Sequence, residues 1–154
     1  MKDFINNKFR RPEPAWDRSL TGEFESSDII KVHRSLGEYS STPLLRLANL
    51  AESLGLRQIL VKDEAHRFGL KAFKALGASY AIYRFICDEF KKSNLDPPAP
   101  DSFYSENDII PPEKFTFCTA TDGNHGRGVA WTASKLEQKA VIYMPKNTVP
   151  ARIE

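Results

Sequence analysis

The pattern of apolar and polar positions separates an irregular beginning of the chain from a series of short predicted helices and strands. Residues 1–41 are rich in polar and aromatic residues without a regular period, which predicts an irregular N-terminal arm. Leucines then recur at helical spacing over residues 47–54, and Gly55 marks the expected helix end. A short apolar run ended by charged residues predicts a strand over residues 58–62.

The longest helical pattern covers residues 72–92. Its apolar positions recur every three or four residues, which predicts one buried face made of Ala75, Ala78, Ile82, Phe85 or Ile86, and Phe90. Gly77 lies inside this pattern, where glycine costs about 1 kcal/mol relative to alanine. We therefore expect close packing against another element at Gly77.

A connection rich in proline and aspartate leads to a second group of predicted elements. Residues 114–120 read as a strand, residues 121–128 as a turn, residues 129–139 as a helix and residues 140–145 as another strand. A strand, a helix and a strand that follow one another with short links predict a parallel sheet. The fold class is therefore α/β, a parallel sheet with flanking helices, with one domain over residues 42–154.

Composition narrows the class of function. The 154 residues contain 41% hydrophobic and 27% charged residues with a net charge of +2, which gives no argument for nucleic acid or an anionic membrane. Cys87 and Cys118 lie far apart without paired spacing, which favours a reducing, cytoplasmic location. The histidines share no ligand spacing with these cysteines, so no metal site is predicted. No signal peptide is recognised, and no run approaches the roughly 20 apolar residues of a membrane span.

Two lysines, Lys71 and Lys74, lie at the beginning of the long predicted helix. A lysine near a helix N-terminus can be kept neutral by burial, and a neutral amine forms Schiff bases with carbonyl compounds. Most lysines are exposed, however, so two solvated residues at a helix end are the alternative interpretation. The preceding residues Asp63 and Glu64 are interpreted as a charge pair at a strand end, with His66 and Arg67 solvated beside them.

A second candidate for chemistry is the turn over residues 119–128, which follows a predicted strand. In parallel sheets ligands bind beyond the carboxyl ends of the strands, where this turn would lie. Glycines at 123 and 126 permit close approach of the backbone. An acid, an amide and an imidazole fall within one turn: Asp122, Asn124 and His125. The alternative is a capping turn in which Asp122 or Asn124 is the N-cap residue.

Four segments in this order carry a resemblance to a known family: TPLLRLANL, VKDEAHRFGLKAFKALGA, TATDGNHGRGVAW and AVIYMPK. Together they resemble the first part of a pyridoxal-phosphate enzyme of the tryptophan-synthase β-like class, also known as fold type II. Within that class they are most similar to the diaminopropionate ammonia-lyases. The resemblance covers residues 42–154 and implies pyridoxal 5'-phosphate as the cofactor.

The resemblance also implies roles for individual residues. Lys74 matches the lysine that forms the Schiff base, whereas Lys71 stands where this family commonly has asparagine. Asn124 matches the asparagine that hydrogen-bonds the cofactor's ring hydroxyl, and Asp122 matches an acid that transfers the α-proton of the substrate. Residues that would flank the cofactor are Phe73, Gly123 and His125. The implied reaction is β-elimination of 2,3-diaminopropionate to pyruvate and ammonia, by an enzyme that is usually a homodimer.

The family's glycine-rich phosphate loop is expected beyond residue 154, so the chain is interpreted as an N-terminal part whose own activity stays open. The open core is then expected to expose apolar surface and sheet edge. One alternative is a serine or threonine dehydratase of the same class, against which Asp122 in place of a serine argues. The other is a truncated relic without catalytic activity that acts, if at all, through a binding partner.

Overall fold

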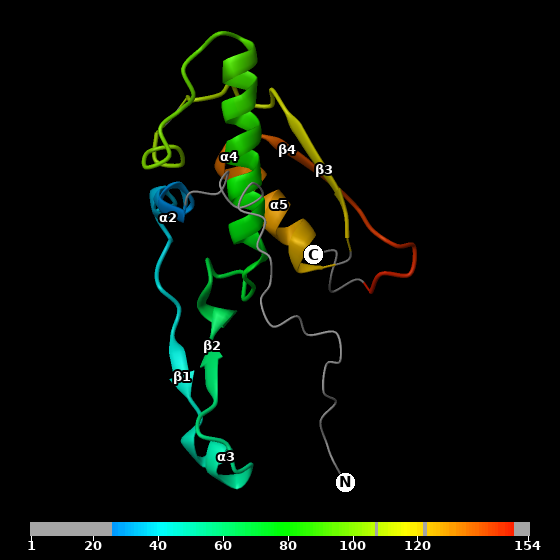
Figure 1. Cartoon of the computed structure of the whole chain (residues 1–154). Helices are drawn as coiled ribbons and strands as arrows, with labels where there is room; N and C mark the ends of the chain where they lie inside the picture. The colour runs from blue at the N-terminus through cyan, green and yellow to red at the C-terminus, as the bar shows by residue number, and fades with distance from the viewer. Residues whose placement is uncertain (1–25, 107, 122, 150–154) are drawn as a thin grey trace, which may run out of the picture.

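The computed structural model describes residues 26–106, 108–121 and 123–149. Helices and strands alternate along this part of the chain (Figure 1). Their order is α2 (Ser26–Ser35), β1 (Leu44–Arg46), α3 (Ala48–Ser53), β2 (Leu60–Lys62), a 3-10 turn (Glu64–His66), α4 (Lys74–Lys92), β3 (Thr116–Ala120), α5 (Asn124–Lys135) and β4 (Lys139–Tyr143). None of the helices in these ranges is long and apolar enough to cross a membrane.

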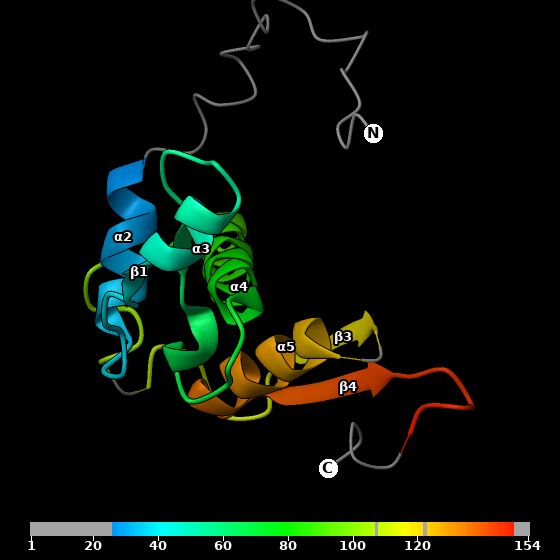
Figure 2. The same cartoon turned by 90° about the horizontal axis from the view of Figure 1, so that it is seen from below.

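The strands β3 and β4 pair in parallel, as the sequence predicts. Their register runs from Thr116 opposite Lys139 to Ala120 opposite Tyr143. Helix α5 connects the two strands and packs on one face of the pair (Figure 2). A strand, a helix and a parallel strand therefore follow one another along the chain, which confirms the α/β class.

Helix α4 is the central element of the molecule. It packs against α5 along its first half and against α2 on another side (Figure 1). Four positions of the predicted apolar face are buried: Ala75, Ala78, Ile82 and Ile86. Phe90 is partly buried, and Phe85 is exposed. The main apolar core forms around α4 with Val32 from α2 and Phe103 from the long connection.

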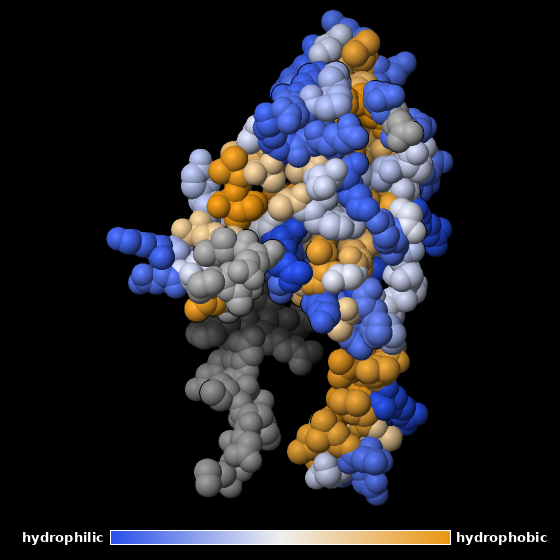
Figure 3. Space-filling view, turned by 180° about the vertical axis from the view of Figure 1, so that it is seen from behind, coloured by the Kyte–Doolittle hydropathy of each residue, from blue (hydrophilic) through white to orange (hydrophobic). Residues whose placement is uncertain are grey.

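The remaining strands form an antiparallel pair that extends away from this core. Strand β1 pairs with β2 with Leu44 opposite Lys62, and α3 caps the far end of the pair (Figure 1). Large apolar side chains of this unit are 40–61% exposed: Leu44, Leu45, Leu50, Leu54, Leu56, Leu60 and Val61. They form an apolar patch on the extended end of the molecule (Figure 3), which agrees with the expected exposure of apolar surface.

Four features differ from the sequence prediction. Residues 26–35 form helix α2 rather than an irregular arm, while the rest of the predicted arm up to residue 25 lies outside the described ranges. The three-residue strand β1 was not predicted, and β2 pairs with it rather than joining the parallel sheet. Helix α5 begins at Asn124, so most of the predicted turn 121–128 is its first turn. No atom lies within 4 Å of a Cβ built on Gly77, so the expected close packing there is wrong.

Candidate active site

Lys74 is the first residue of helix α4, and Phe73 is its N-cap residue. The helix begins without a side-chain cap, and the amide of Leu76 donates to the Phe73 carbonyl at 3.0 Å. Both Lys74 and Phe73 are exposed, and the Lys74 Nζ lies 5.1 Å from the centre of the Phe73 ring. The amine is therefore accessible to a small molecule beside an aromatic surface.

Asn124 is the first residue of helix α5. The preceding Gly123 is the N-cap residue and has an extended backbone, so Asn124 does not have the N-cap position that the alternative interpretation allowed. The Asn124 side chain is exposed, and no hydrogen-bond partner for it occurs within the ranges that the structure describes. Its amide is thus available to a ligand. Asp122 lies outside the described residues, and its roles remain predictions.

The beginnings of the two helices meet at Gly128. A Cβ built on Gly128 would lie 3.0 Å from the Cα and the nitrogen of Ala75 and 3.2 Å from the carbonyl carbon of Lys74. Any side chain at position 128 would therefore push α5 away from the residue that carries the amine. Since Asn124 precedes Gly128 by one helical turn, the amine-bearing and amide-bearing helix ends are neighbours.

Gly126 and His125 lie in the first turn of α5, where one contributes to packing and the other lines a groove. A Cβ on Gly126 would lie 2.7 Å from methyl groups of Ile142 and Thr121, so this glycine lets α5 approach β4. His125 lines an open apolar groove of about 410 Å³ between α4 and β3. Lys74 and Asn124 are not among the described residues that line this groove. The structure therefore brings Lys74, Phe73 and Asn124 to one end of the helix pair. His125 lines the neighbouring groove, and its role beside the cofactor stays a prediction.

The seven residues 67–73, which we call the lysine turn, lead into α4 with an unusual backbone. Three of them have positive φ angles: Phe68 at 50°, Gly69 at 69° and Lys71 at 55°. Glycine adopts this conformation freely, whereas a residue with a Cβ pays roughly 1 kcal/mol or more for it. Arg127 of α5 donates to the Leu70 carbonyl at 3.4 Å. The turn that carries Lys71 and ends before Lys74 is thus strained and needs support from its surroundings.

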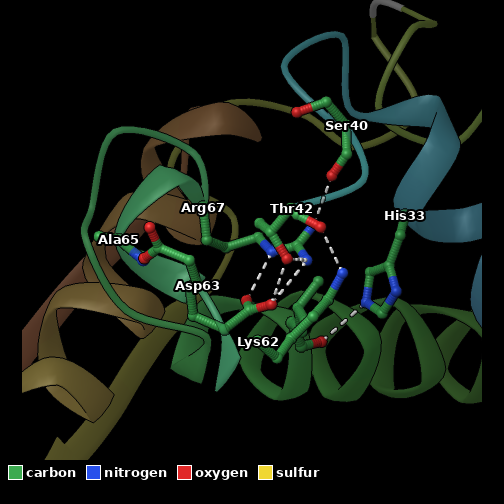
Figure 4. Close-up of polar contacts among 9 residues, drawn as sticks. His33, Ser40, Thr42, Lys62, Asp63, Ala65 and Arg67 are labelled. Atoms are coloured by element: carbon green, nitrogen blue, oxygen red, sulfur yellow. Dashed lines mark hydrogen bonds and ion pairs between the residues drawn. The ribbon is translucent and has the colours of Figure 1, made fainter. Parts of the chain in front are cut away.

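Much of this support comes from Arg67, whose side chain is buried rather than solvated as the sequence suggested. The residue is 5% exposed. Its Nε donates to Glu64 at 2.9 Å, its Nη2 donates to the same carboxylate at 3.1 Å, and its Nη1 donates to the Ser40 carbonyl at 2.8 Å (Figure 4). Thr42 completes the group, because its hydroxyl donates to Glu64 at 2.6 Å and accepts from Arg67 at 3.2 Å. We call these four residues the Arg67 cluster.

The Arg67 cluster keeps both of its charges. Hydrogen bonds from Arg67, and secondarily from Thr42, lower the pKa of the Glu64 carboxyl to about 2. In return, the hydrogen bond to Glu64 raises the pKa of the Arg67 guanidinium. Lys62 donates to the Thr42 carbonyl and ties β2 to the same point. The bidentate ion pair between Arg67 and Glu64 therefore stays charged at neutral pH. Its hydrogen bonds to Ser40 and Thr42 hold residues 40–42 and the lysine turn together.

A column of aromatic rings passes through the Arg67 cluster. The Arg67 guanidinium lies 5.3 Å from the Tyr39 ring centre and 5.6 Å from that of Phe68. Phe68 in turn stacks on Trp131 of α5 at 4.7 Å. On the other side, the His33 ring of α2 stacks on Tyr39 at 6.0 Å. The column therefore connects α2, the lysine turn and α5.

His33 also fastens α2 directly to the first turn of α4. Its Nε2 lies 2.9 Å from the Leu76 carbonyl, to which it donates (Figure 4). Burial lowers the pKa of His33, and the nearby Arg67 charge lowers it further. The imidazole is therefore neutral at pH 7. Leu76 is two residues beyond Lys74, so α2 also contributes to fixing this end of the helix.

Little in the local sequence indicates the Arg67 cluster. Glu64 and Arg67 are three residues apart in a charged stretch, a pattern that usually belongs to a solvated surface. Their partners Ser40 and Thr42 lie more than twenty residues earlier, and only the pairing of β1 with β2 brings them close. The glycine at position 69 is a local sequence sign of an unusual turn, and the structure gives it a φ of 69°.

Comparison with known proteins places this arrangement in a family. Residues 36–154 match the family model described as pyridoxal-phosphate dependent enzyme. The diaminopropionate ammonia-lyase of Escherichia coli K12 is 43% identical over 152 residues, which are 99% of this chain and 36% of that protein. The Salmonella typhimurium diaminopropionate ammonia-lyase is 47% identical over 82% of this chain and 31% of its own length. The chain therefore spans about a third of the length of these curated relatives.

Solved structures agree with this assignment. Holo diaminopropionate ammonia lyase from Escherichia coli superposes with a TM-score of 0.71 at 45% identity, over 83% of this chain and 31% of that one. The same enzyme in complex with D-serine gives a TM-score of 0.68 at 44% identity, over 84% and 33% of the two chains. The expected fold type II architecture is thereby confirmed. With more than half of its residues matched by the family model, this chain belongs to the pyridoxal-phosphate dependent enzymes.

Proposed function

We propose that this chain forms the N-terminal part of a lyase that uses pyridoxal 5'-phosphate to eliminate the β-amino group of 2,3-diaminopropionate as ammonia. Water then converts the remaining aminoacrylate to pyruvate and a second ammonia. The observation that carries the proposal is the meeting of two helix ends that bear Lys74 and Asn124. Identities of 43–47% with diaminopropionate ammonia-lyases support the choice of substrate. Residues 42–154 would be the catalytic-domain part, with residues 1–41 as a leading arm.

The groups at this point fit the ring end of the cofactor. Lys74 offers an exposed primary amine for the carbonyl carbon, Asn124 offers a free amide, and Phe73 offers an exposed apolar ring. The close contact at Gly128 keeps the two helix ends adjacent. Bound pyridoxal phosphate supplies an electron sink for the charge that develops when an amino-acid substrate loses its α-proton.

Three residues of the chain have proposed roles in binding the cofactor and in transferring the α-proton. Lys74 holds the cofactor through its amine, and Asn124 orients it by donating from its amide to the ring hydroxyl. Lys74 and Asp122 are the two groups proposed to hold or move the α-proton, one from each face of the substrate, which would allow both D and L substrates. A general acid or base must be within hydrogen-bond reach of the proton that it transfers.

Three further proposals accompany this function. The substrate is a small amino acid, the complete enzyme is a homodimer, and the enzyme works in the cytoplasm. Cys87 and Cys118 are free thiols in this structure, which agrees with a reducing compartment. A threonine dehydratase of Pasteurella multocida is a more distant relative at 29% identity over 73% of this chain, so assays with 2,3-diaminopropionate and L-threonine would separate the two substrate classes.

The test of the proposed function uses the purified chain with pyridoxal phosphate and borohydride reduction, followed by mapping of the labelled peptide. We expect label on Lys74, because it is exposed at the start of α4, where the start of α5 packs against its backbone at Gly128. Lys74→Ala should abolish this label, and Lys71→Ala is the matched control that should keep it. Label on Lys71, or label spread over many lysines in the unsubstituted chain, would contradict the proposal.

A further inference from the structure

We propose that Arg67 is a positioning residue for the Lys74 amine. The inference rests on the proposed function, because it takes Lys74 as the lysine that carries the cofactor. Arg67 does not touch the amine. It acts through the lysine turn, whose first residue it is and whose last residue precedes Lys74.

The Arg67 cluster is better suited to fixing geometry than to adding stability. A buried ion pair loses most of its Coulombic gain to desolvation, so apolar residues of the same size would stabilise the fold equally well. A guanidinium, however, donates in one plane and in fixed directions. With Glu64 on one side and the Ser40 carbonyl on another, the Arg67 side chain has one favourable position.

Backbone hydrogen bonds connect the fixed position of Arg67 to the start of α4. The Leu70 amide donates to the Arg67 carbonyl at 2.9 Å, and the Leu76 amide donates to the Phe73 carbonyl at 3.0 Å. The left-handed residues Phe68 and Lys71 lie within this segment, and their backbone angles are incompatible with a regular helix or strand. A turn of this kind persists only when its surroundings hold it.

Support from α5 fixes the other side of the turn. Phe68 lies between the Arg67 guanidinium and the Trp131 ring, so loss of the guanidinium frees one face of Phe68. The Arg127 bond to Leu70 is longer and exposed, and it cannot replace the cluster. Arg67 is therefore the residue that ties the direction of the turn, and with it the start of α4, to residues 40–42.

The first measurement needs no cofactor. Backbone amide exchange is recorded for the unsubstituted chain, for Arg67→Lys, and for the milder Thr42→Val, with Arg57→Lys as a control at an exposed arginine. We expect the Leu70 and Leu76 amides to exchange about tenfold faster in Arg67→Lys and a few-fold faster in Thr42→Val, because the turn opens locally. Exchange at Ile86, deep in α4, should not change in either variant.

The second measurement is the ratio of borohydride-fixed label on Lys74 to that on Lys71. A residue that only stabilises the fold would change the total label but not the ratio. We expect the ratio to fall about fivefold or more in Arg67→Lys, since correct placement of a reacting group is worth at least this much. Arg57→Lys should keep the ratio of the unsubstituted chain.

The outcomes separate the two proposals. Exchange that rises equally along all of α4, or that does not change at Leu70 and Leu76, overturns the role of Arg67. So does a Lys74 to Lys71 ratio that stays constant in Arg67→Lys while the unsubstituted chain labels Lys74 selectively; the proposed function then stands. If the unsubstituted chain shows no preference for Lys74 but the local exchange effect is present, the proposed function fails and Arg67 keeps its role in ordering the turn.

Discussion

The two helix ends that form the candidate site are held by opposite means. The beginning of α4 depends on side chains: a buried ion pair and a column of rings support a strained turn. The beginning of α5 depends on positions without a side chain, because Gly126 and Gly128 let the helix approach β4 and α4. One end is therefore sensitive to charge and pH, and the other to volume. Substitutions can test each dependence separately.

The largest effect is expected when the ion pair is broken from the carboxylate side. Glu64→Gln leaves the buried Arg67 charge without its counter-charge, and this should lower the free energy of unfolding by about 3 kcal/mol. Urea unfolding measures the change. Glu52→Gln, on the exposed face of α3, is the control and should have almost no effect. A loss below about 1 kcal/mol would show that α4 does not depend on the pair.

Volume at the other helix end should have the next largest effect. Gly128→Ala places a methyl group 3.0 Å from the Ala75 backbone, which cannot move without shifting α4. We expect a loss of about 2 kcal/mol in the free energy of unfolding, typical of an overpacked contact. Gly77→Ala is the matched control in a helix with open space around the new methyl, and it should gain up to about 1 kcal/mol. Equal effects of the two substitutions would contradict the steric interpretation.

Acid should weaken the α4 end selectively. The folded-state pKa of Glu64 is about 2, below its ordinary value of 4.5, so the folded protein favours the charged carboxylate. The resulting stability is fully present above pH 4.5 and is lost as the pH falls from 4.5 toward 2. Because Glu64 is partly exposed, we expect a loss of roughly 2 kcal/mol rather than the full value of the shift.

The measurement compares unfolding of the unsubstituted chain and of Glu64→Gln at several pH values between 5 and 3. His33 also prefers its neutral form and loses stability on acidification, but it is present in both proteins and cancels in the difference. The difference in unfolding free energy should therefore shrink as the pH falls. A difference that is independent of pH would assign the effect of the substitution to packing.

The smallest change in the free energy of unfolding is expected for a substitution of Lys71. Its φ of 55° suits glycine or asparagine better than lysine. Lys71→Gly should therefore raise the free energy of unfolding by roughly 0.5–1 kcal/mol, measured by thermal or urea unfolding. Borohydride-fixed label on Lys74 should be unchanged. A loss of stability would mean that the lysine side chain makes a contribution that outweighs the strain of its backbone.

The sequence predicted those elements whose own residues decide them. The long apolar period fixed α4 to within two residues of its observed start, and alternating patterns located β3 and β4. The position of Lys74 at a helix N-terminus follows directly. The start of α5 was placed too late because GNHGRG looks like a turn, whereas its glycines are needed for close packing of a helix.

Other features depend on contacts that no local pattern contains. Strand β1 has three residues, too few to show a period, and exists because β2 lies opposite it. The burial of Arg67 requires Ser40 and Thr42, which are far away in the sequence. Phe68 tolerates a left-handed backbone because its ring stacks on Trp131. These residues could not be assigned until the chain was folded.

The stacking of Phe68 on Trp131 also gives the molecule an optical reporter. The chain has two tryptophans, and Trp16 lies outside the described residues, so a Trp16→Phe variant would leave the emission of one indole. That indole touches the lysine turn through Phe68 and carries the Lys135 ammonium 5.4 Å from its ring centre. Fluorescence intensity and wavelength should therefore follow the order of the turn, and quenching by energy transfer should follow arrival of an absorbing aldehyde at Lys74.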